Sequence, residues 1–321
     1  MPVPVSDLTN VVAVSGGGQN AYALRSDGTV WEWGLDTGTF LTGPQQAEHD
    51  TPAQVSGLTH VVAVAGGYNA AYALRTDGTV WAWGFGALGQ PGENPYRTTT
   101  PLKVRDLPSI RAVAGGWDGG YAIATDGSAW EIGTQGVSRI SGVPPITSIA
   151  SSDGTELALA TDGTVWNIGV DLCAFWTQPT SVAIVVEKIP SLQHATKIAA
   201  GQSTGYALLA DGTVWAWGTN TAGALGDGDS DQSKECTSTP IRVLGLSHVT
   251  DIVSFGTNAY ALRSDGTVWS WGAYNAGALG NGTDAYTYPG IMGSDHPVEV
   301  SGLTGIAAIG ASYATGYAVV R

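Results

Sequence analysis

The chain has 321 residues, of which 13 are basic and 27 acidic, and its formal net charge is −14. The basic residues do not cluster, so the sequence lacks the positive stripe that binds nucleic acid, and an anionic membrane surface would repel it. Because 43% of the residues are hydrophobic and 12 are tryptophan, we expect a folded protein, and no apolar run approaches the ~18 residues of a membrane-spanning helix.

One ten-residue phrase recurs six times along the chain. Its first copy, residues 25–34, reads Arg-Ser-Asp-Gly-Thr-Val-Trp-Glu-Trp-Gly. The Asp-Gly pairs of the six copies begin at Asp27, Asp77, Asp126, Asp162, Asp211 and Asp265. Their spacing of 36 to 54 residues is typical of the blades of a β-propeller rather than of helical repeats.

Each repeat contains four short segments with the composition of β-strands. In the first repeat, Val11–Val14 is a β-branched run that predicts a buried strand, called strand A, and Tyr22–Leu24 predicts strand B. The Asp-Gly turn, which we expect to be of type I′, leads to strand C, Thr29–Trp33. Pro52–Val55 predicts an edge strand, strand D, because proline is tolerated there. Four strands per repeat predict an all-β fold of the β-propeller class.

Strands A and B occur seven times, once more than strand C. The seventh A strand starts near Ile306, and the sequence ends at its B strand before any Asp-Gly turn. Residues 2–5, Pro-Val-Pro-Val, read like strand D of the sixth repeat, Pro-Val-Glu-Val at residues 297–300. We therefore expect a single domain over residues 1–321, a seven-bladed propeller whose seventh blade is completed from both termini and lacks one strand.

The repeat resembles that of the regulator of chromosome condensation family. In the fifth repeat the Asp-Gly-Thr-Val-Trp-x-Trp-Gly phrase is followed by Asn-Thr-Ala-Gly-Ala-Leu-Gly-Asp-Gly at residues 220–228, and residues 275–282 repeat this signature as Asn-Ala-Gly-Ala-Leu-Gly-Asn-Gly. The resemblance extends over essentially the whole chain and implies a seven-bladed propeller. A sequence that ends inside the last blade also resembles the bacterial beta-lactamase inhibitory proteins of this architecture, which implies a secreted bacterial protein.

The family's functions differ among its members. An acidic chain without a basic tail is unlike the chromatin-docking nucleotide exchange factor. Of the tryptophan motif of the plant ultraviolet-B receptor only Gly116-Trp117 is present, followed by Asp118 instead of arginine. We therefore expect neither nucleotide exchange on chromatin nor photoreception.

The two faces of the expected propeller differ in how much their loops vary. Because strands alternate in direction, the A–B loops and C–D connections share one face, the loop face, and the B–C turns lie on the other. The B–C turns repeat Asp-Gly six times whereas all A–B loops differ, which places recognition on the loop face. The resemblance to the inhibitory proteins implies aromatic residues there that grip a protein. The candidate binding residues are the aromatic Tyr68, Trp117 and Tyr313 and the polar Asn69, Asp118 and Asp153.

Paired tryptophans in strand C, such as Trp31 and Trp33, share one face of their strand. They could form a platform for sugars or pack between blades, and we predict packing. His60, His194 and His248 each precede an A strand on different repeats, which predicts a turn position instead of a joint catalytic site.

Two acidic patterns admit chemistry, each beside a simpler explanation. Asp227, Asp229 and Asp231 alternate as in a calcium loop, but Gln232 stands where an EF-hand requires glycine and Ser238 where it requires glutamate, so we expect solvated carboxylates and no metal. Asp118 and Asp153 on adjacent blades could serve acid–base chemistry, but solvated loop acids are commoner. No Ser-His-Asp or Cys-His set can be assembled on the loop face.

The sequence contains two cysteines, Cys173 and Cys236, in the C–D connections of neighbouring repeats. Two cysteines alone do not make a zinc site, and they form one disulfide or none. We expect the disulfide, which favours an oxidising compartment, extracellular or periplasmic. Met1-Pro2-Val3-Pro4 lacks the basic and apolar regions of a signal peptide.

The sequence thus predicts a monomeric, non-catalytic scaffold without a cofactor that binds another protein through the loop face, as an inhibitor or an interaction module. The alternative is an enzyme or a carbohydrate-binding protein that uses a central pocket on the same face. Converging carboxylates would favour the alternative, whereas a flat aromatic surface would favour protein binding.

Overall fold

The computed structural model describes residues 2–18, 20–35, 48–86, 88–90, 97–117, 119–153, 155–173, 184–229, 236–274, 277–282, 293–313 and 315–321. The chain forms two compact units: residues 4–149, the N-terminal unit, and residues 1–3 with 150–321, the C-terminal unit.

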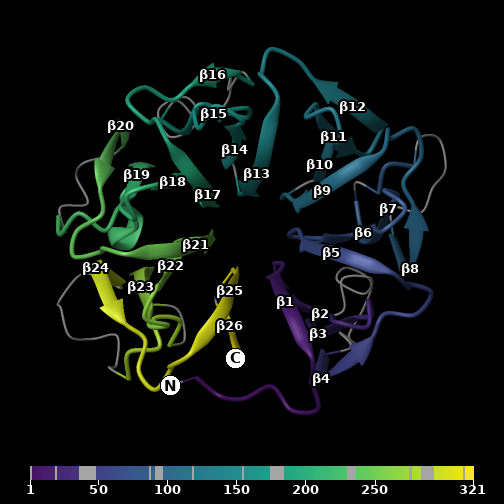
Figure 1. Ribbon diagram of the computed structural model, residues 1–321, viewed down its shortest axis with the longest axis horizontal. Helices are drawn as coiled ribbons and strands as arrows, with labels where there is room; N and C mark the ends of the chain where they lie inside the picture. The colour runs from purple at the N-terminus through teal and green to yellow at the C-terminus, as the bar shows by residue number, and fades with distance from the viewer. Residues whose placement is uncertain are drawn as a thin grey trace. The chain divides into compact units, whose positions relative to one another are not determined.

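The N-terminal unit contains three four-stranded antiparallel sheets, each in the order A-B-C-D along the chain (Figure 1). Their strands are β1 (Val11–Gly16), β2 (Asn20–Arg25), β3 (Val30–Leu35) and β4 (Glu48–Gln54); β5 (Val61–Gly66), β6 (Ala70–Arg75), β7 (Val80–Phe85) and β8 (Arg97–Lys103); and β9 (Ile110–Gly115), β10 (Gly120–Ala124), β11 (Ala129–Gly133) and β12 (Gly136–Ile140).

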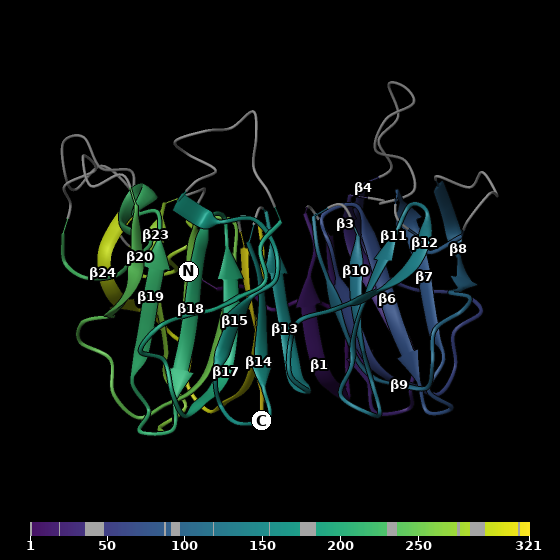
Figure 2. The ribbon, with the colours of Figure 1, turned by 90° about the horizontal axis from the view of Figure 1, so that it is seen from above.

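The strands that follow form three more four-stranded sheets and one sheet of two strands. They are β13 (Ile146–Ser152), β14 (Thr155–Ala160), β15 (Val165–Asn167) and β16 (Glu187–Lys188); β17 (Ala195–Gly201), β18 (Thr204–Leu209), β19 (Val214–Gly218) and β20 (Thr237–Arg242); β21 (Val249–Phe255), β22 (Asn258–Arg263), β23 (Val268–Ala273) and β24 (Gly293–Glu299); and β25 (Ile306–Ser312) and β26 (Thr315–Val320). In the C-terminal unit, β17, β18 and β19 stand side by side in Figure 2.

The prediction of four antiparallel strands per repeat is confirmed in six blades, and the fold class is an all-β propeller. Among the described residues, helical structure is confined to η1 (Thr221–Gly223), a single 3-10 turn, and to Leu172 and Cys173. No helix in the described residues has the length and apolar character needed to cross a membrane.

The prediction that the N-terminal segment completes the seventh blade is wrong. The blade has two described strands, β25 and β26, and residues 2–5 form no strand, with Val3 83% exposed. In each complete blade strand D pairs only with strand C, so a segment like residues 2–5 has no ladder to join where strand C is lacking. The single domain over residues 1–321 stays a prediction.

The B–C turns have a different geometry from the predicted type I′. Only the glycine of each Asp-Gly pair has a positive φ, 77° at Gly28, while Gly28 N–H donates to the Arg25 carbonyl at 2.9 Å. Asp27 stays in the ordinary region because its Oδ1 accepts from the Thr29 backbone N–H at 3.0 Å and from Thr29 Oγ1 at 2.6 Å. The Asp27 carboxylate therefore holds the turn closed through its hydrogen bonds to Thr29. Of the two residues of the Asp-Gly pair, only the glycine adopts a left-handed backbone.

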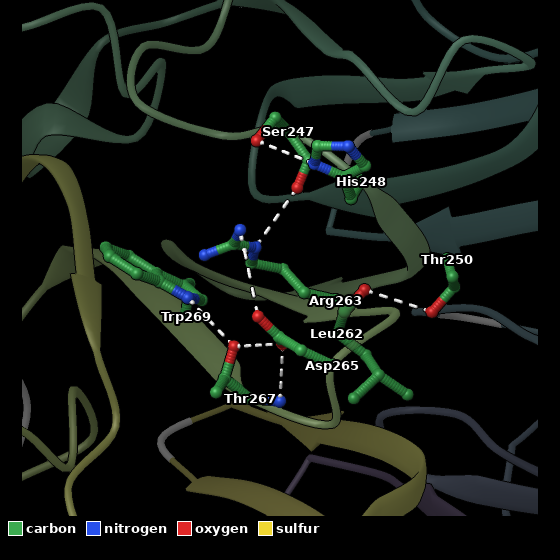
Figure 3. A network of polar contacts seen from close by, with 8 residues as sticks. All are labelled: Ser247, His248, Thr250, Leu262, Arg263, Asp265, Thr267 and Trp269. Carbon is green, nitrogen blue, oxygen red and sulfur yellow. Dashed lines mark hydrogen bonds and ion pairs between the residues drawn. The ribbon is translucent and has the colours of Figure 1, made fainter.

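Figure 3 shows this turn network in the sixth blade. Thr267 Oγ1 donates to Asp265 Oδ1 at 2.7 Å and accepts from Trp269 Nε1 at 3.3 Å. The Arg263 guanidinium lies 5.7 Å from the centre of the Trp269 ring and 3.7 Å from Asp265 Oδ2, and its Nε donates to the Ser247 carbonyl at 3.1 Å. One turn thus orients the half-buried tryptophan of strand C and ties it to the preceding D–A connection.

A main-chain bond joins each B–C turn to the next blade. The Gly28 carbonyl accepts from Val61 N–H at 3.2 Å, and His60, just before Val61, has a φ of 58° and accepts through its carbonyl from Thr76 N–H at 2.9 Å. The turn position predicted for His60, His194 and His248 is confirmed, since all three have left-handed backbone. The same joint links Ile110 to Gly78, Ile146 to Gly127, Ala195 to Gly163, Val249 to Gly212 and Ile306 to Gly266.

The core consists of layers between successive blades, and tryptophan is their largest component. Trp83 of the second blade meets Tyr22 of the first edge to face, with centroids 5.8 Å apart, and Trp271 of the sixth meets Tyr206 of the fifth in the same way at 5.9 Å. Trp83, Trp217 and Trp271 are at most 2% exposed, so packing between blades is confirmed for these three. Burying one such side chain removes up to ~250 Å² from water, worth roughly 6 kcal/mol.

The carboxylates of the B–C turns make the stability of the folded state depend on pH. Hydrogen bonds from the hydroxyl and then the backbone N–H two residues later lower the pKa of Asp27, Asp77, Asp126, Asp162, Asp211 and Asp265. Because the folded pKa is lower, ionised carboxylates stabilise the folded state above their ordinary pKa of about 4, and this contribution is lost as pH falls through the folded pKa.

Replacing Thr267 with valine should raise the pKa of Asp265 towards its ordinary value, because the hydroxyl is the largest cause of the shift. Carbon-13 NMR titration of the carboxylates measures this. Thr250→Val is the matched control, since Thr250 Oγ1 donates to the Leu262 carbonyl (Figure 3) and not to Asp265. An Asp265 pKa that is the same in both variants would contradict the assignment.

Candidate binding face

The A–B loops can be aligned by counting from the first residue of each A strand, and the residue seven positions later is called the first loop position. The first loop position is occupied by Gly18, Tyr68, Trp117, Asp153, Gln202, Gly256 and Tyr313. Four of the six predicted binding residues therefore occupy equivalent places in their blades. Asn69 occupies the second position, and so does Asp118, which lies outside the described residues.

In the N-terminal unit the structure brings Tyr68 and Trp117 together. Their rings stack with centroids 3.7 Å apart and planes inclined by 25°, and both side chains are half-buried. Tyr68 N–H donates to the Gly116 carbonyl at 2.9 Å, which fixes one loop against the next. The two rings therefore form one stacked unit, called the platform.

Gly18, in the loop of the first blade, makes room for this platform. A Cβ atom at Gly18 would lie 2.8 Å from Cδ2 of Tyr68 and 2.6 Å from its carbonyl oxygen, closer than real side chains approach. Gly18 N–H donates to the Gly67 carbonyl at 3.2 Å. The order of the platform is therefore the Gly18 backbone, the Tyr68 ring and the Trp117 ring.

Asn69 holds the loop of the second blade to the end of strand C. Its carbonyl accepts from Phe85 N–H at 2.8 Å, at the point where Gly84 has a φ of 108°. A Cβ at Gly84 would lie 2.5 Å from that carbonyl oxygen. The backbone of Asn69 thus supports Tyr68 beside it.

In the C-terminal unit, Asp153 is bound to the neighbouring loop. Its Oδ2 accepts from Gln202 Nε2 at 2.7 Å, and its carbonyl accepts from Ser203 N–H at 3.3 Å. Gln202 N–H in turn donates to the Gly256 carbonyl at 2.5 Å, so the loops of the fourth, fifth and sixth blades form a continuous polar chain. Sequence reasoning missed Gln202, although it shares the first loop position with Asp153.

Tyr313 lies at the end of this row of loops and is 38% exposed. A Cβ at Gly256 would lie 2.9 Å from the Tyr313 carbonyl oxygen and 3.4 Å from its Cδ2. Gly256 therefore makes room for Tyr313 in the next loop, as Gly18 does for Tyr68. The sequence signal is a glycine at the first loop position in the blade before an aromatic residue.

The C–D connection of the fifth blade begins with a segment held by several hydrogen bonds. Asn220 is buried; its Oδ1 accepts from Leu225 N–H at 3.0 Å and its Nδ2 donates to the Asp229 carbonyl at 2.9 Å. Ala224 directly precedes Leu225, and its carbonyl accepts a hydrogen bond from Trp271 Nε1 at 3.0 Å. The Ala-Leu-Gly signature thus anchors the connection to the next blade.

A disulfide joins Cys173 and Cys236, whose Cα atoms are 5.5 Å apart. It links the connection after β15 to the start of β20, across two successive blades of the C-terminal unit.

The acidic loop around Asp227 makes a local turn, in which Asp229 N–H donates to Asp227 Oδ1 at 3.1 Å, and Asp231 lies outside the described residues. Within the described part of the chain, no three His, Cys, Asp or Glu side chains are placed to hold a metal ion. The acid–base pair of Asp118 with Asp153 also includes a residue outside that part.

Six four-stranded blades with repeated turns and varied loops define a β-propeller built from tandem repeats. Two family models, both described as the regulator of chromosome condensation (RCC1) repeat, match the sequence, one at residues 211–259 and 265–320 and the other at 61–90 and 195–224. The matched segments are repeats of this kind, which confirms the resemblance that the recurring phrase indicated. No curated protein matches the sequence.

Solved structures share the fold at low sequence identity. Prp20p from Saccharomyces cerevisiae is 19% identical with a TM-score of 0.80, and the match covers 97% of this chain and 83% of Prp20p. Human WBSCR16 is 17% identical with a TM-score of 0.81, covering 97% of this chain and 86% of that protein. A match to the bacterial inhibitory proteins stays a prediction.

Removing the disulfide should destabilise the C-terminal unit by about 4 kcal/mol, the chain-entropy value for a bridge across 63 residues. The test compares urea unfolding of Cys173→Ser/Cys236→Ser with that of the oxidised protein. The reduced wild-type protein is the matched control and should behave like the double variant. Equal stability of all three forms would contradict a stabilising bridge.

The stacked platform should appear as coupling in a double-mutant cycle. Tyr68→Ala and Trp117→Ala should each lower the free energy of unfolding. We expect the loss in the double variant to be smaller than the sum of the two single losses by about 0.5–1.5 kcal/mol, because either change alone already removes the stack. Tyr68→Phe, which retains the ring, should retain the coupling to Trp117. Additive effects would show that the two rings act separately.

Proposed function

We propose that this protein is a non-catalytic scaffold that binds another protein through its loop face, as an inhibitor or an interaction module. The observation that carries the proposal is the contrast between the two faces. The B–C turns repeat one hydrogen-bonded structure, whereas the equivalent first positions of the A–B loops carry different side chains, among them Tyr68, Trp117 and Tyr313.

The chemistry of the platform favours a protein partner. Tyrosine and tryptophan are enriched where proteins meet, because they bring a large apolar area and a polar edge with few rotatable bonds. The stack of Tyr68 on Trp117 limits the motion of both rings, so less entropy is lost on binding. The main-chain bonds from Gly18 to Gly67 and from Tyr68 to Gly116 hold the loops in place in the same way.

Proteins of the same fold support this reading. The structure of Prp20p is described with its binding properties to Gsp1p and histones, and another structure shows yeast RCC1 (Prp20) bound by Kap60; that match is 20% identical with a TM-score of 0.55 and covers 97% of this chain and 68% of that one. These partners belong to those proteins. For this chain they support the use of the repeat propeller as a protein-binding surface.

The test is quantitative capture of proteins from an extract of the source organism on three immobilised forms. They are the wild type, Tyr68→Ala/Trp117→Ala and the control Val62→Ala, which changes a 51% exposed residue near the start of the same β5 that leads to Tyr68. We expect a protein that the wild type and the control retain and the double variant loses at least tenfold. Melting curves of all three forms establish that each is folded.

Two outcomes would contradict the proposal. Equal capture by all three forms would place any binding away from the platform. Capture that disappears after the extract is treated with glycosidases would favour carbohydrate binding on the same face.

A further inference from the structure

The Lys and Arg residues of the N-terminal unit gather at the strand ends that meet the B–C turns. Apart from Arg97, the first residue of β8, they end strand B, lie at the end of strand D or just after it, or lie at the start of strand A. This set consists of Arg25, Arg75, Lys103, Arg105, Arg111 and Arg139. The positive charge of the unit is therefore concentrated away from the A–B loops.

Acidic residues of the turns balance this positive charge locally. Arg25 Nη1 lies 4.0 Å from Asp27 Oδ2. At Asp77 the hydrogen bonds from Thr79 lower the pKa of the carboxylate most, and the charge of Arg75 lowers it further. Because the turn side is balanced in this way, the acidic excess of the chain, whose formal net charge is −14, comes mainly from residues outside the turns.

Two of these arginines also contact tryptophan. The Arg25 guanidinium lies 5.7 Å from the centre of the Trp31 ring, and the Arg75 guanidinium lies 5.5 Å from the centre of the Trp81 ring. The indole N–H of each ring donates to the threonine hydroxyl two residues earlier in the chain, at 3.3 Å. In both cases this chain itself supplies a cation for the ring face and an acceptor for the indole edge.

Trp117 of the platform has neither of these contacts. Among the described residues no Lys or Arg lies over its ring, and its Nε1 donates to no acceptor. Tyr68 covers one face of the Trp117 ring, and the side chain is only half-buried, so part of the indole stays accessible. Tryptophan attracts cations more strongly than the other aromatic residues, because the face of its ring is negative. Trp117 can therefore take from a binding partner the two contacts that Trp31 and Trp81 make within the chain.

We infer that the protein partner of the loop face places an arginine of a basic segment over the Trp117 ring; this inference rests on the proposed function. A backbone carbonyl of the same segment accepts the indole N–H. Arginine fits better than lysine, because its planar guanidinium stacks on a ring and is more weakly hydrated than an ammonium group. The charge distribution favours the same partner, since a loop side with few basic residues on an acidic chain attracts positive charge and repels acidic proteins.

Two synthetic peptides test the chemistry of the partner. The first is acetyl-Gly-Arg-Gly-Arg-Gly-Arg-Gly-amide, and in the second glutamine replaces each arginine. NMR of the nitrogen-15-labelled full chain follows the indole N–H resonances, and that of Trp117 is assigned by its loss in Trp117→Phe. We expect the arginine peptide to shift this resonance with half-saturation at about 1 mM, and the glutamine peptide to bind roughly tenfold more weakly. The resonances of Trp31 and Trp81 should stay in place, because Arg25 and Arg75 already lie over their rings.

Two matched lysine substitutions test whether the attraction is local to the platform. Asn69→Lys adds a positive charge beside Tyr68, and Val62→Lys adds the same charge near the far end of β5, at a residue that is 51% exposed. The six residues of β5 span roughly 20 Å, about twice the screening length of ~10 Å in 0.1 M salt. Asn69→Lys should therefore weaken binding of the arginine peptide by roughly threefold or more, whereas Val62→Lys should leave it unchanged.

The inference is overturned if the glutamine peptide shifts the Trp117 resonance as well as the arginine peptide does, or if both lysine variants bind the arginine peptide equally. The peptide comparison uses the unaltered protein, so a folding defect in Asn69→Lys leaves the inference open to refutation.

The outcome is distinguishable from that of the proposed function. If Tyr68→Ala/Trp117→Ala loses the captured protein but about 1 mM arginine peptide does not compete with that protein, the scaffold function stands and the arginine contact is excluded. Equal capture by all three immobilised forms would contradict both.

Discussion

The packing of a bulky strand C side chain against strand B of the preceding blade is the contact on which the rest of the structure depends. A single blade is four strands with apolar side chains on both faces, and it buries them only against its neighbours. Trp83 on Tyr22 and Trp271 on Tyr206 close these layers with the same edge-to-face geometry. Each large core cluster accordingly draws its residues from two successive blades.

The Asp-Gly turn sets the position of that tryptophan along the strand. Its carboxylate binds the following threonine, the threonine hydroxyl accepts from the outer indole, and the glycine carbonyl accepts from the next A strand. One short phrase thus forms the hairpin, orients strand C and joins two blades. Because the turn side fulfils these three tasks, the A–B loops can differ between blades, and one of these differences is the stack of Tyr68 on Trp117.

Periodicity predicted the strands well because side chains on both faces of a blade must be apolar. It was less reliable where the outcome depends on a partner distant in sequence. Residues 2–5 have the composition of strand D but form no strand, since that strand requires a strand C to pair with. The type I′ turn was wrong because the Asp27 carboxylate, not two left-handed residues, closes the hairpin. Gln202 was overlooked because its role is to bind Asp153 from the adjacent blade.

The sequence by itself determined the repeat, the order of strands, the Asp-Gly turns and the face on which the loops vary. These are properties of single blades, and hydrophobic pattern and turn chemistry over ~50 residues specify them. Tertiary structure alone decided that Tyr68 and Trp117 stack with Gly18 beside them, and that Asp153 is bound by Gln202. Each of these depends on the contact between neighbouring blades, which the apolar layers between them set and no single repeat encodes.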